Sequence, residues 1–195
     1  MTMNAPFMLT TDRLVCRRLE DRDKIPFFAY RRLPAVGEFQ FFQPAAMAEV
    51  ERFFEKLAAL PAVPDTWFQM GLHLKQNDVL IGDVGMHFLD ESRQVEIGYS
   101  VAPDFQRQGY ASEAVAATIA YLFGVLGVHR ITASIDPRNT ASAALLAKMH
   151  FRFEAHFVKS VQIGGDWLDD CIYALLRDEW VANNPGTDPG KAMKT

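Results

Sequence analysis

Cysteine is scarce in this sequence, with two residues of this type in a chain of 195. Cys16 and Cys171 form no C-x-x-C pair, and neither has a histidine nearby at the spacing of metal ligands. Proteins that depend on disulfides or structural zinc carry more cysteines, in such patterns. Because 49% of the residues are hydrophobic, a chain of this length can bury a full core without such support. We therefore expect one compact domain without a disulfide or a metal ion.

Long apolar runs are also missing. The most apolar stretch, residues 119–128, is interrupted by Gly124 and Gly127 and is too short to cross a bilayer. The first ten residues lack the basic start and apolar middle of a secretory signal. We therefore expect a cytoplasmic protein without a membrane partner.

An excess of basic residues is absent as well. The formal net charge is −4, so there is no general positive field to bind the phosphates of a nucleic acid, and we expect no such partner. A mildly acidic protein would suit a cationic partner such as an amine, although solubility alone explains the same charge.

Internal repeats and low-complexity blocks are not found either. The one linker-like stretch is the end of the chain, residues 181–195, which reads V-A-N-N-P-G-T-D-P-G-K-A-M-K-T. Its content of proline, glycine and asparagine predicts a flexible tail. The domain itself is expected over residues 11–180.

The spacing of apolar residues predicts both strands and helices. Alternation from residue 67 to 74, and again in residues 79–89 and 94–101, predicts three antiparallel strands joined by tight turns. Apolar residues three or four positions apart predict helices over residues 47–57 and 110–126. The predicted order of elements is β-α-α-β-β-β-α-β-α-β-β. A strand, a helix and a strand between residues 95 and 135 imply a parallel crossover within a mixed sheet. This is an α/β layered domain.

The most informative segment is Q-V-E-I-G-Y-S-V-A-P-D-F-Q-R-Q-G-Y-A-S-E-A, a strand followed by a loop and a helix start. The free N–H groups of a helix N-terminus can hold a pyrophosphate, Gly109 lets the backbone approach it, and Arg107 adds a positive charge. The plainer alternative is that Gly109 only shapes the loop and that Glu113 completes an ordinary helix start. The segment lacks the G-K-[ST] and G-x-G-x-x-G patterns of the common nucleotide-binding folds.

Together with two later stretches, this segment resembles the GNAT N-acetyltransferase superfamily, in particular its RimJ/RimL-type branch. The stretches are H-R-I-T-A-S-I-D-P-R-N-T-A-S-A-A-L-L-A-K-M-H-F-R-F-E-A and G-D-W-L-D-D-C-I-Y-A-L-L-R-D-E-W, and an opening T-D-R-L-V-C-R-R-L matches as well. The resemblance covers residues 11–180. It implies a single-domain mixed sheet with helices on both faces and a splay between the fourth and fifth predicted strands.

The resemblance also implies a function. Acetyl-CoA would serve as co-substrate, with no metal, and its acetyl group would pass by direct attack to a primary amine, either a protein N-terminus or a small amine. A homodimer is expected. The residues that would hold acetyl-CoA lie on the fourth predicted strand, in the loop after it, and before the last predicted helix: Tyr99, Ser100, Val101, Gln106, Arg107, Gln108, Gly109, Tyr110, Ala111, Ser112 and Asn139.

Two of these residues have simpler interpretations that stay open. Asn139 could reach the pantetheine arm, or it could cap the helix that follows. Tyr110 could stack near CoA or fill the core. A backbone N–H at Val101 could stabilise the oxyanion that develops on the thioester.

Direct attack needs a neutral amine, so a base must take a proton from the ammonium form. Glu96 is the first candidate for this base, and its alternative is a cross-strand ion pair. Ser142 matches the family position that contacts the leaving sulfur, but it could equally be a small polar residue in a first helical turn. Three histidines on predicted strands are weaker candidates for the base: His73, His87 and His156.

The sequence departs from the branch at two positions. Val161 stands where some members carry a strand glutamate, and His150 replaces a frequent glycine. Four phenylalanines of the first two helices could line the acceptor cleft or fill the core: Phe41, Phe42, Phe53 and Phe54. Two other functions remain as alternatives, a non-catalytic acetyl-CoA sensor and an interaction module without affinity for CoA.

Overall fold

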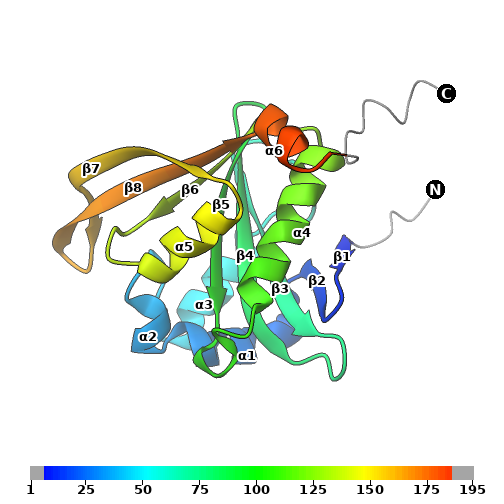
Figure 1. The fold of residues 1–195 in the computed structure, drawn as a ribbon. Coiled ribbons are helices and arrows are strands. Elements are labelled where there is room, and N and C mark those ends of the chain that lie inside the picture. The colour runs from blue at the N-terminus through cyan, green and yellow to red at the C-terminus, as the bar shows by residue number, and fades with distance from the viewer. Residues whose placement is uncertain (1–6, 186–195) are drawn as a thin grey trace.

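One mixed sheet runs through the residues that the structure, a computed structural model, describes, namely 7–185 (Figure 1). Within them the sheet has eight strands in the order β1-β2-β3-β4-β5-β6-β8-β7. All neighbouring strands are antiparallel except β5 and β6, which are parallel, as the predicted crossover requires. The strands are β1 (Met8–Thr10), β2 (Leu14–Arg18), β3 (Thr66–Leu74), β4 (Leu80–Leu89), β5 (Gln94–Val101), β6 (Arg130–Ile135), β7 (Arg152–Ile163) and β8 (Asp166–Leu176).

Helices cover both faces of this sheet. They are α1 (Lys24–Arg31), α2 (Pro34–Gly37), α3 (Met47–Glu55), α4 (Tyr110–Gly124), α5 (Thr140–Lys148) and α6 (Arg177–Asn183), with short 3₁₀ turns η1 (Asp21–Asp23) and η2 (Pro103–Phe105). The apolar side chains of α4 pack on one face with those of the central strands. The apolar side chains of α1 and α3 form a second cluster on the opposite face. The predicted α/β class and its two helical layers are therefore confirmed.

Alternate side chains of β3 face the two helical layers, one on each side of the sheet. Phe68 and Met70 are fully buried in the cluster under α4, as the pattern predicted. Gln69 and His73 point to the other face and are also buried, because α1 and α3 cover it. An alternating strand therefore lies between two packed layers, and its polar side chains must find partners inside the protein.

Three elements were absent from the predicted order. Strand β1 has only three residues, too few to show a period, and it exists because it pairs with β2. Helix α2 is a single turn that begins at Pro34. Helix α6 begins where Glu179 accepts a hydrogen bond from the Leu176 N–H at 2.8 Å, and it continues past residue 180. Trp180 anchors it against Phe123, with ring centroids 5.6 Å apart.

Part of the expected tail, residues 186–195, lies outside the described residues. Within 7–185, no helix combines the length and the apolar character needed to span a bilayer. Both cysteines are buried and unpaired, and burial, reinforced by the charge of Glu113, raises the pKa of the Cys16 thiol to about 12.

Candidate active site

The sheet opens between β5 and β6. The two strands pair over only three positions, from Gln94 opposite Arg130 to Glu96 opposite Thr132. Beyond that point β5 continues to Val101 and β6 to Ile135 without pairing. The predicted splay between the fourth and fifth predicted strands is therefore present, as β5 and β6. It leaves strand N–H and C=O groups without a ladder partner, and an extended ligand could pair with them.

The loop from β5 to α4 closes one end of this opening. Gly109 is the N-cap of α4 and has a φ of +85°, a left-handed conformation that favours glycine. Among the residues that the structure describes, no side chain caps the helix, so the N–H groups of its first turn are available to a ligand. Arg107 is exposed, and within residues 7–185 its guanidinium has no ion-pair partner. Gln106 points back to the strand and donates to the Val101 carbonyl at 2.9 Å.

A residue that sequence reasoning did not select holds this loop in place. Arg13 donates to the Gln108 carbonyl at 2.9 Å, pairs with Glu113 at 2.7 Å, and lies 4.2 Å from the centroid of the Tyr110 ring. The Glu113 carboxylate also accepts hydrogen bonds from the Thr11 hydroxyl and the Arg13 N–H. These bonds outweigh burial and lower the Glu113 pKa. Glu113 therefore ties the turn between β1 and β2 to α4 rather than simply completing its own helix.

A hydroxyl pair spans the other side of the opening. Tyr99 Oη lies 2.7 Å from Ser142 Oγ; Ser142 is buried and Tyr99 is partly buried. Burial raises the pKa of Tyr99 to about 12, although the hydrogen bond to Ser142 opposes this. Asn139 accepts a hydrogen bond from the Ser142 N–H at 3.0 Å, so it does act as the N-cap of α5. The cap fixes the first turn of α5 and with it the position of the Ser142 hydroxyl.

Glu96 lies on the opposite face of β5 from Tyr99, as the alternation predicted. Among residues 7–185 its carboxylate takes part in no hydrogen bond or ion pair. His87 stands directly opposite in the register, but its ring stacks on Trp67 with centroids 4.8 Å apart. Burial raises the Glu96 pKa; the neighbouring His87 lowers it, and the charge of Asp170 raises it further. The cross-strand ion pair is therefore not formed, and the carboxylate is half-buried and unengaged.

One buried hydroxyl near the opening also lacks a partner. Ser100 Oγ is inaccessible and has no hydrogen bond within the described part of the chain. A buried polar atom without a partner raises the free energy of the folded state, so this hydroxyl is a local source of instability beside the opening. Nearby on the same strand, Gly98 carries no side chain, and a Cβ placed there would have no atom within 4 Å. The face of β5 that carries Glu96 therefore has open space beside the splay.

The remaining histidine candidates are held elsewhere. His73 is buried, and its Nε2 lies 3.1 Å from Asp23 Oδ1 in a network with Arg17. His156 pairs with Asp169 at 2.7 Å on the outer hairpin of β7 and β8. Neither ring has a hydrogen bond or an ion pair with Glu96.

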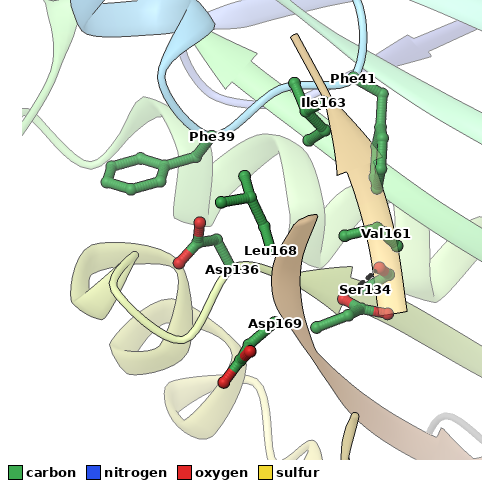
Figure 2. A pocket seen from close by; sticks show the side chains of 9 residues that line it. Phe39, Phe41, Ser134, Asp136, Val161, Ile163, Leu168 and Asp169 are labelled. Carbon is green, nitrogen blue, oxygen red and sulfur yellow. Dashed lines mark hydrogen bonds between the residues drawn. The ribbon is translucent and has the colours of Figure 1, made fainter. Parts of the chain in front are cut away.

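A pocket lies on the Glu96 face, between the loop from α2 to α3 and the β7–β8 hairpin (Figure 2). Its lining combines aromatic, aliphatic and acidic side chains: Phe39, Phe41, Ser134, Asp136, Val161, Ile163, Leu168, Asp169 and Asp170. Figure 2 shows Phe39 and Phe41 on the loop side and Val161 and Ile163 on the hairpin side.

The four phenylalanines that could line a cleft or fill the core divide between the two roles. Phe41 is exposed and lines the pocket. Phe42, Phe53 and Phe54 instead pack around Phe27, with ring centroids 5.4–6.4 Å from it. Phe39, which sequence reasoning missed, lies over Arg138, with its ring centroid 5.7 Å from Cζ.

The two departures from the family pattern have structural consequences. His150 has a φ of +64° just after α5, a conformation in which glycine is preferred. A histidine here adopts it at a small cost in backbone strain. Val161 contributes an apolar wall to the pocket at the position where the resemblance suggested a glutamate.

One family model and several known proteins are similar to this chain in sequence. A family model described as an acetyltransferase (GNAT) domain matches residues 13–152. YnaD, an uncharacterised N-acetyltransferase of Bacillus subtilis (strain 168), is 30% identical over 176 residues, covering 88% of this chain and 98% of the relative. The [ribosomal protein uS5]-alanine N-acetyltransferase of Escherichia coli (strain K12) is 28% identical over 186 residues, covering 88% and 92%.

Solved structures agree with these matches. An acetyltransferase of the GNAT family from Bacillus anthracis superposes with a TM-score of 0.79 at 27% identity, covering 89% of this chain and all of that one. RimJ from Mycobacterium smegmatis, solved with CoA-disulfide, has a TM-score of 0.77 at 21% identity, covering 89% of each chain. At that identity the second likeness concerns the fold alone.

Proposed function

This chain belongs to the GNAT acetyltransferase family, and we propose that it transfers the acetyl group of acetyl-CoA to a primary amine by direct attack. Its activity class is that of an acyltransferase, as for the relatives named N-acetyltransferases. The observation that carries the proposal is the splay of β5 and β6 beside an uncapped helix N-terminus. A strand with free backbone groups and a phosphate site at its end match the two halves of CoA.

Acetyl-CoA is held by three parts of this chain. The loop and the first turn of α4 surround the pyrophosphate: Gln106, Arg107, Gln108, Gly109, Tyr110, Ala111 and Ser112. The backbone of Tyr99, Ser100 and Val101 pairs with the pantetheine arm. Asn139 contacts it from the far side while capping α5. The positive φ at Gly109 supports the fit of a phosphate group here, as does Arg107, which has no ion-pair partner in the described part of the chain.

The chemistry uses both sides of the opening. When bound, acetyl-CoA supplies the thioester that carries the acetyl group. Glu96 takes the proton that the acceptor must lose before its nitrogen can attack, either directly or through a water molecule. Ser142 donates a hydrogen bond to the departing sulfur, and Tyr99 fixes the orientation of that hydroxyl. Glu96 thus acts on the acceptor nitrogen from one face of the sheet, and Ser142 acts on the leaving sulfur from the other.

We also propose that the protein forms a homodimer. Strand β7 is the edge of the sheet, and the hairpin that it forms with β8 exposes large apolar side chains: Phe153, Phe157, Val158 and Trp167. An exposed apolar edge strand is prone to pair with another chain.

Acetyl transfer from labelled acetyl-CoA to a panel of amines tests the proposed activity. The panel includes small monoamines, diamines and peptides with free N-termini, and transfer to at least one class is expected. Binding of CoA without transfer to any amine would favour the sensor alternative. An unchanged melting temperature with a large excess of CoA would favour the interaction module, because ligand at about 100 times its Kd stabilises a protein by about 2.7 kcal/mol.

A further inference from the structure

Three carboxylates line the pocket on the Glu96 face, and two of them have basic side chains of the protein as partners. Asp136 pairs with Arg138 at 2.6 Å. Asp169 pairs with His156 at 2.7 Å and accepts the Lys159 N–H. These two acids therefore have partners without any ligand.

Asp170 is different. It is 9% exposed, and Ser134 Oγ donates to its Oδ1 at 2.6 Å. Within residues 7–185 no cation pairs with Asp170, and its Oδ2 has no hydrogen-bond donor. A carboxylate that is buried without a cation is unfavourable, and it gains most when a cation binds. Because Asp170 lines the pocket, that cation can come from a ligand.

The position of Asp170 relates it to the proposed reaction. Glu96 is the last residue of β5 that pairs with β6, opposite Thr132, so Gly98 would lie level with Ser134 across the splay. Ser134 in turn holds Asp170 on the neighbouring strand β8. Adjacent strands are about 4.8 Å apart, so Asp170 lies roughly 5–10 Å from a group held within the splay. The charge of Asp170 also reaches Glu96, whose pKa it helps to raise.

We propose that Asp170 binds a second positive charge on the acceptor, so that the preferred substrates are diamines or other amines with an additional cationic group. This inference rests on the proposed function. The nitrogen that attacks must be uncharged, so the cation that stays on Asp170 belongs to a different nitrogen of the same molecule. A spacer of about four methylene groups spans the distance, and the apolar walls of Val161, Ile163 and Leu168 can pack against it.

A pair of isosteric substrates tests this assignment. In 1,4-diaminobutane and n-pentylamine the reacting end is the same, but the far end is an ammonium group in one and a methyl group in the other. In the wild-type protein we expect kcat/KM to be at least about tenfold higher for the diamine. In Asp170→Asn the ratio should fall towards one, mostly through a higher KM for the diamine, while the KM for acetyl-CoA stays unchanged.

Asp166→Asn is the matched control, because it removes the same charge from the same strand outside the pocket lining. It should keep the wild-type ratio. A wild-type ratio near one, or a ratio that survives in Asp170→Asn, would overturn the role of Asp170 and leave the acetyltransferase activity standing. Acetylation of other amines of the panel but not of 1,4-diaminobutane would overturn that role in the same way. Failure to acetylate any amine would instead reject the proposed function itself.

Discussion

At the scale of single residues, the Glu96 carboxylate has no hydrogen bond or ion pair with any residue of 7–185. The histidine opposite it stacks on Trp67 instead, and burial together with the charge of Asp170 keeps the pKa of the carboxyl above its ordinary value. A base with a raised pKa is a better proton acceptor near neutral pH. If Glu96 is the base, its active form is the carboxylate, which dominates only above the raised pKa, so the rate should fall on the acid side at a higher pH than an ordinary glutamate would give.

Substitution of Glu96 by Gln should therefore lower kcat by about 100-fold and leave CoA binding intact. The loss should shrink at high pH, because solvent then deprotonates the amine without help. Rates measured from pH 6 to 10, together with melting temperatures, distinguish a base from a residue that only supports folding. A near-normal rate at neutral pH would remove Glu96 from the mechanism.

The Tyr99 and Ser142 pair predicts a second effect at this scale. Tyr99→Phe keeps the ring in its packing site and removes only the hydroxyl that lies 2.7 Å from Ser142 Oγ. If that hydroxyl orients Ser142 towards the leaving sulfur, kcat should fall by about tenfold with little change in the Kd for CoA. Tyr121→Phe is the control, because within the described residues the Tyr121 hydroxyl has no hydrogen bond. Equal kcat values for the two variants would contradict the proposed role.

At the scale of elements, the loop before α4 depends on a distant strand turn. Arg13 and Glu113 join the turn between β1 and β2 to the start of the helix. These contacts hold the helix N-terminus without a ligand, which would lower the entropic cost of the phosphate binding proposed there.

Gly109→Glu tests this element. The new side chain would begin 3.3 Å from Arg13 Nη2 and would place a negative charge where a pyrophosphate is expected, so CoA binding should be lost. Gly127→Glu is a close control, because Gly127 also has a positive φ, +66° against +85°, and open space around it. Titration calorimetry should show wild-type affinity for the control and none for Gly109→Glu. Undiminished binding in Gly109→Glu would refute the assignment of the loop.

At the scale of the whole molecule, a buried charged network joins the helical layer of α1 to the sheet. Asp23 precedes α1 and accepts a hydrogen bond from Arg17 on β2, at 2.8 Å, and its Oδ1 lies 3.1 Å from Nε2 of His73 on β3. Burial opposes ionisation of Asp23, but these bonds outweigh it and hold the Asp23 pKa well below its usual range. The folded state therefore favours the ionised form more than the unfolded state does.

The consequence is a predictable loss of stability in acid. The contribution of Asp23 is complete above the unfolded pKa of about 4 and declines as the pH falls towards the depressed folded value. Asp23→Asn should lower the free energy of unfolding at pH 7 by about 3 kcal/mol, because it removes the nearer of the two carboxylates that pair with the largely buried Arg17 and leaves only Glu20, at 3.6 Å. Asp21→Asn, at an exposed position, should change it little. Urea unfolding from pH 3 to 7 measures both. A variant as stable as the wild type at pH 7 would contradict the argument.

The proposed dimer belongs to the same scale. Light scattering at micromolar concentration should give about twice the chain mass of 22.0 kDa. Replacement of Phe157 and Val158 by Asp on the edge strand β7 should shift the mass to that of one chain, because charge on an edge blocks strand pairing. A wild-type protein with the mass of a single chain would contradict the proposed homodimer.

Much of this protein was determined by local sequence. Alternation from Phe68 onwards predicted β3, the spacing of Val115 and Ile119 predicted α4, and Gly109 marked the loop that needs a left-handed residue. These features depend on residues a few positions apart, because backbone preference and burial periodicity repeat over two to four residues. The splay between β5 and β6 was predicted from the family resemblance, because no local sequence pattern indicates it.

Only the tertiary structure decided which side chains meet. Tyr99 and Ser142 are 43 positions apart in sequence, and Arg13 and Glu113 are 100 apart, so no local period relates them. The sequence allowed a cross-strand ion pair for Glu96, but in the structure the ring of His87, which lies opposite, stacks on Trp67. Asp170 differs from its acidic neighbours because the order β6-β8-β7 buries it beside Ser134, whereas Asp136 pairs with Arg138 and Asp169 contacts His156. The charge and shape of such a site depend on strand order and on how separate segments pack, and a single strand or helix does not contain that information.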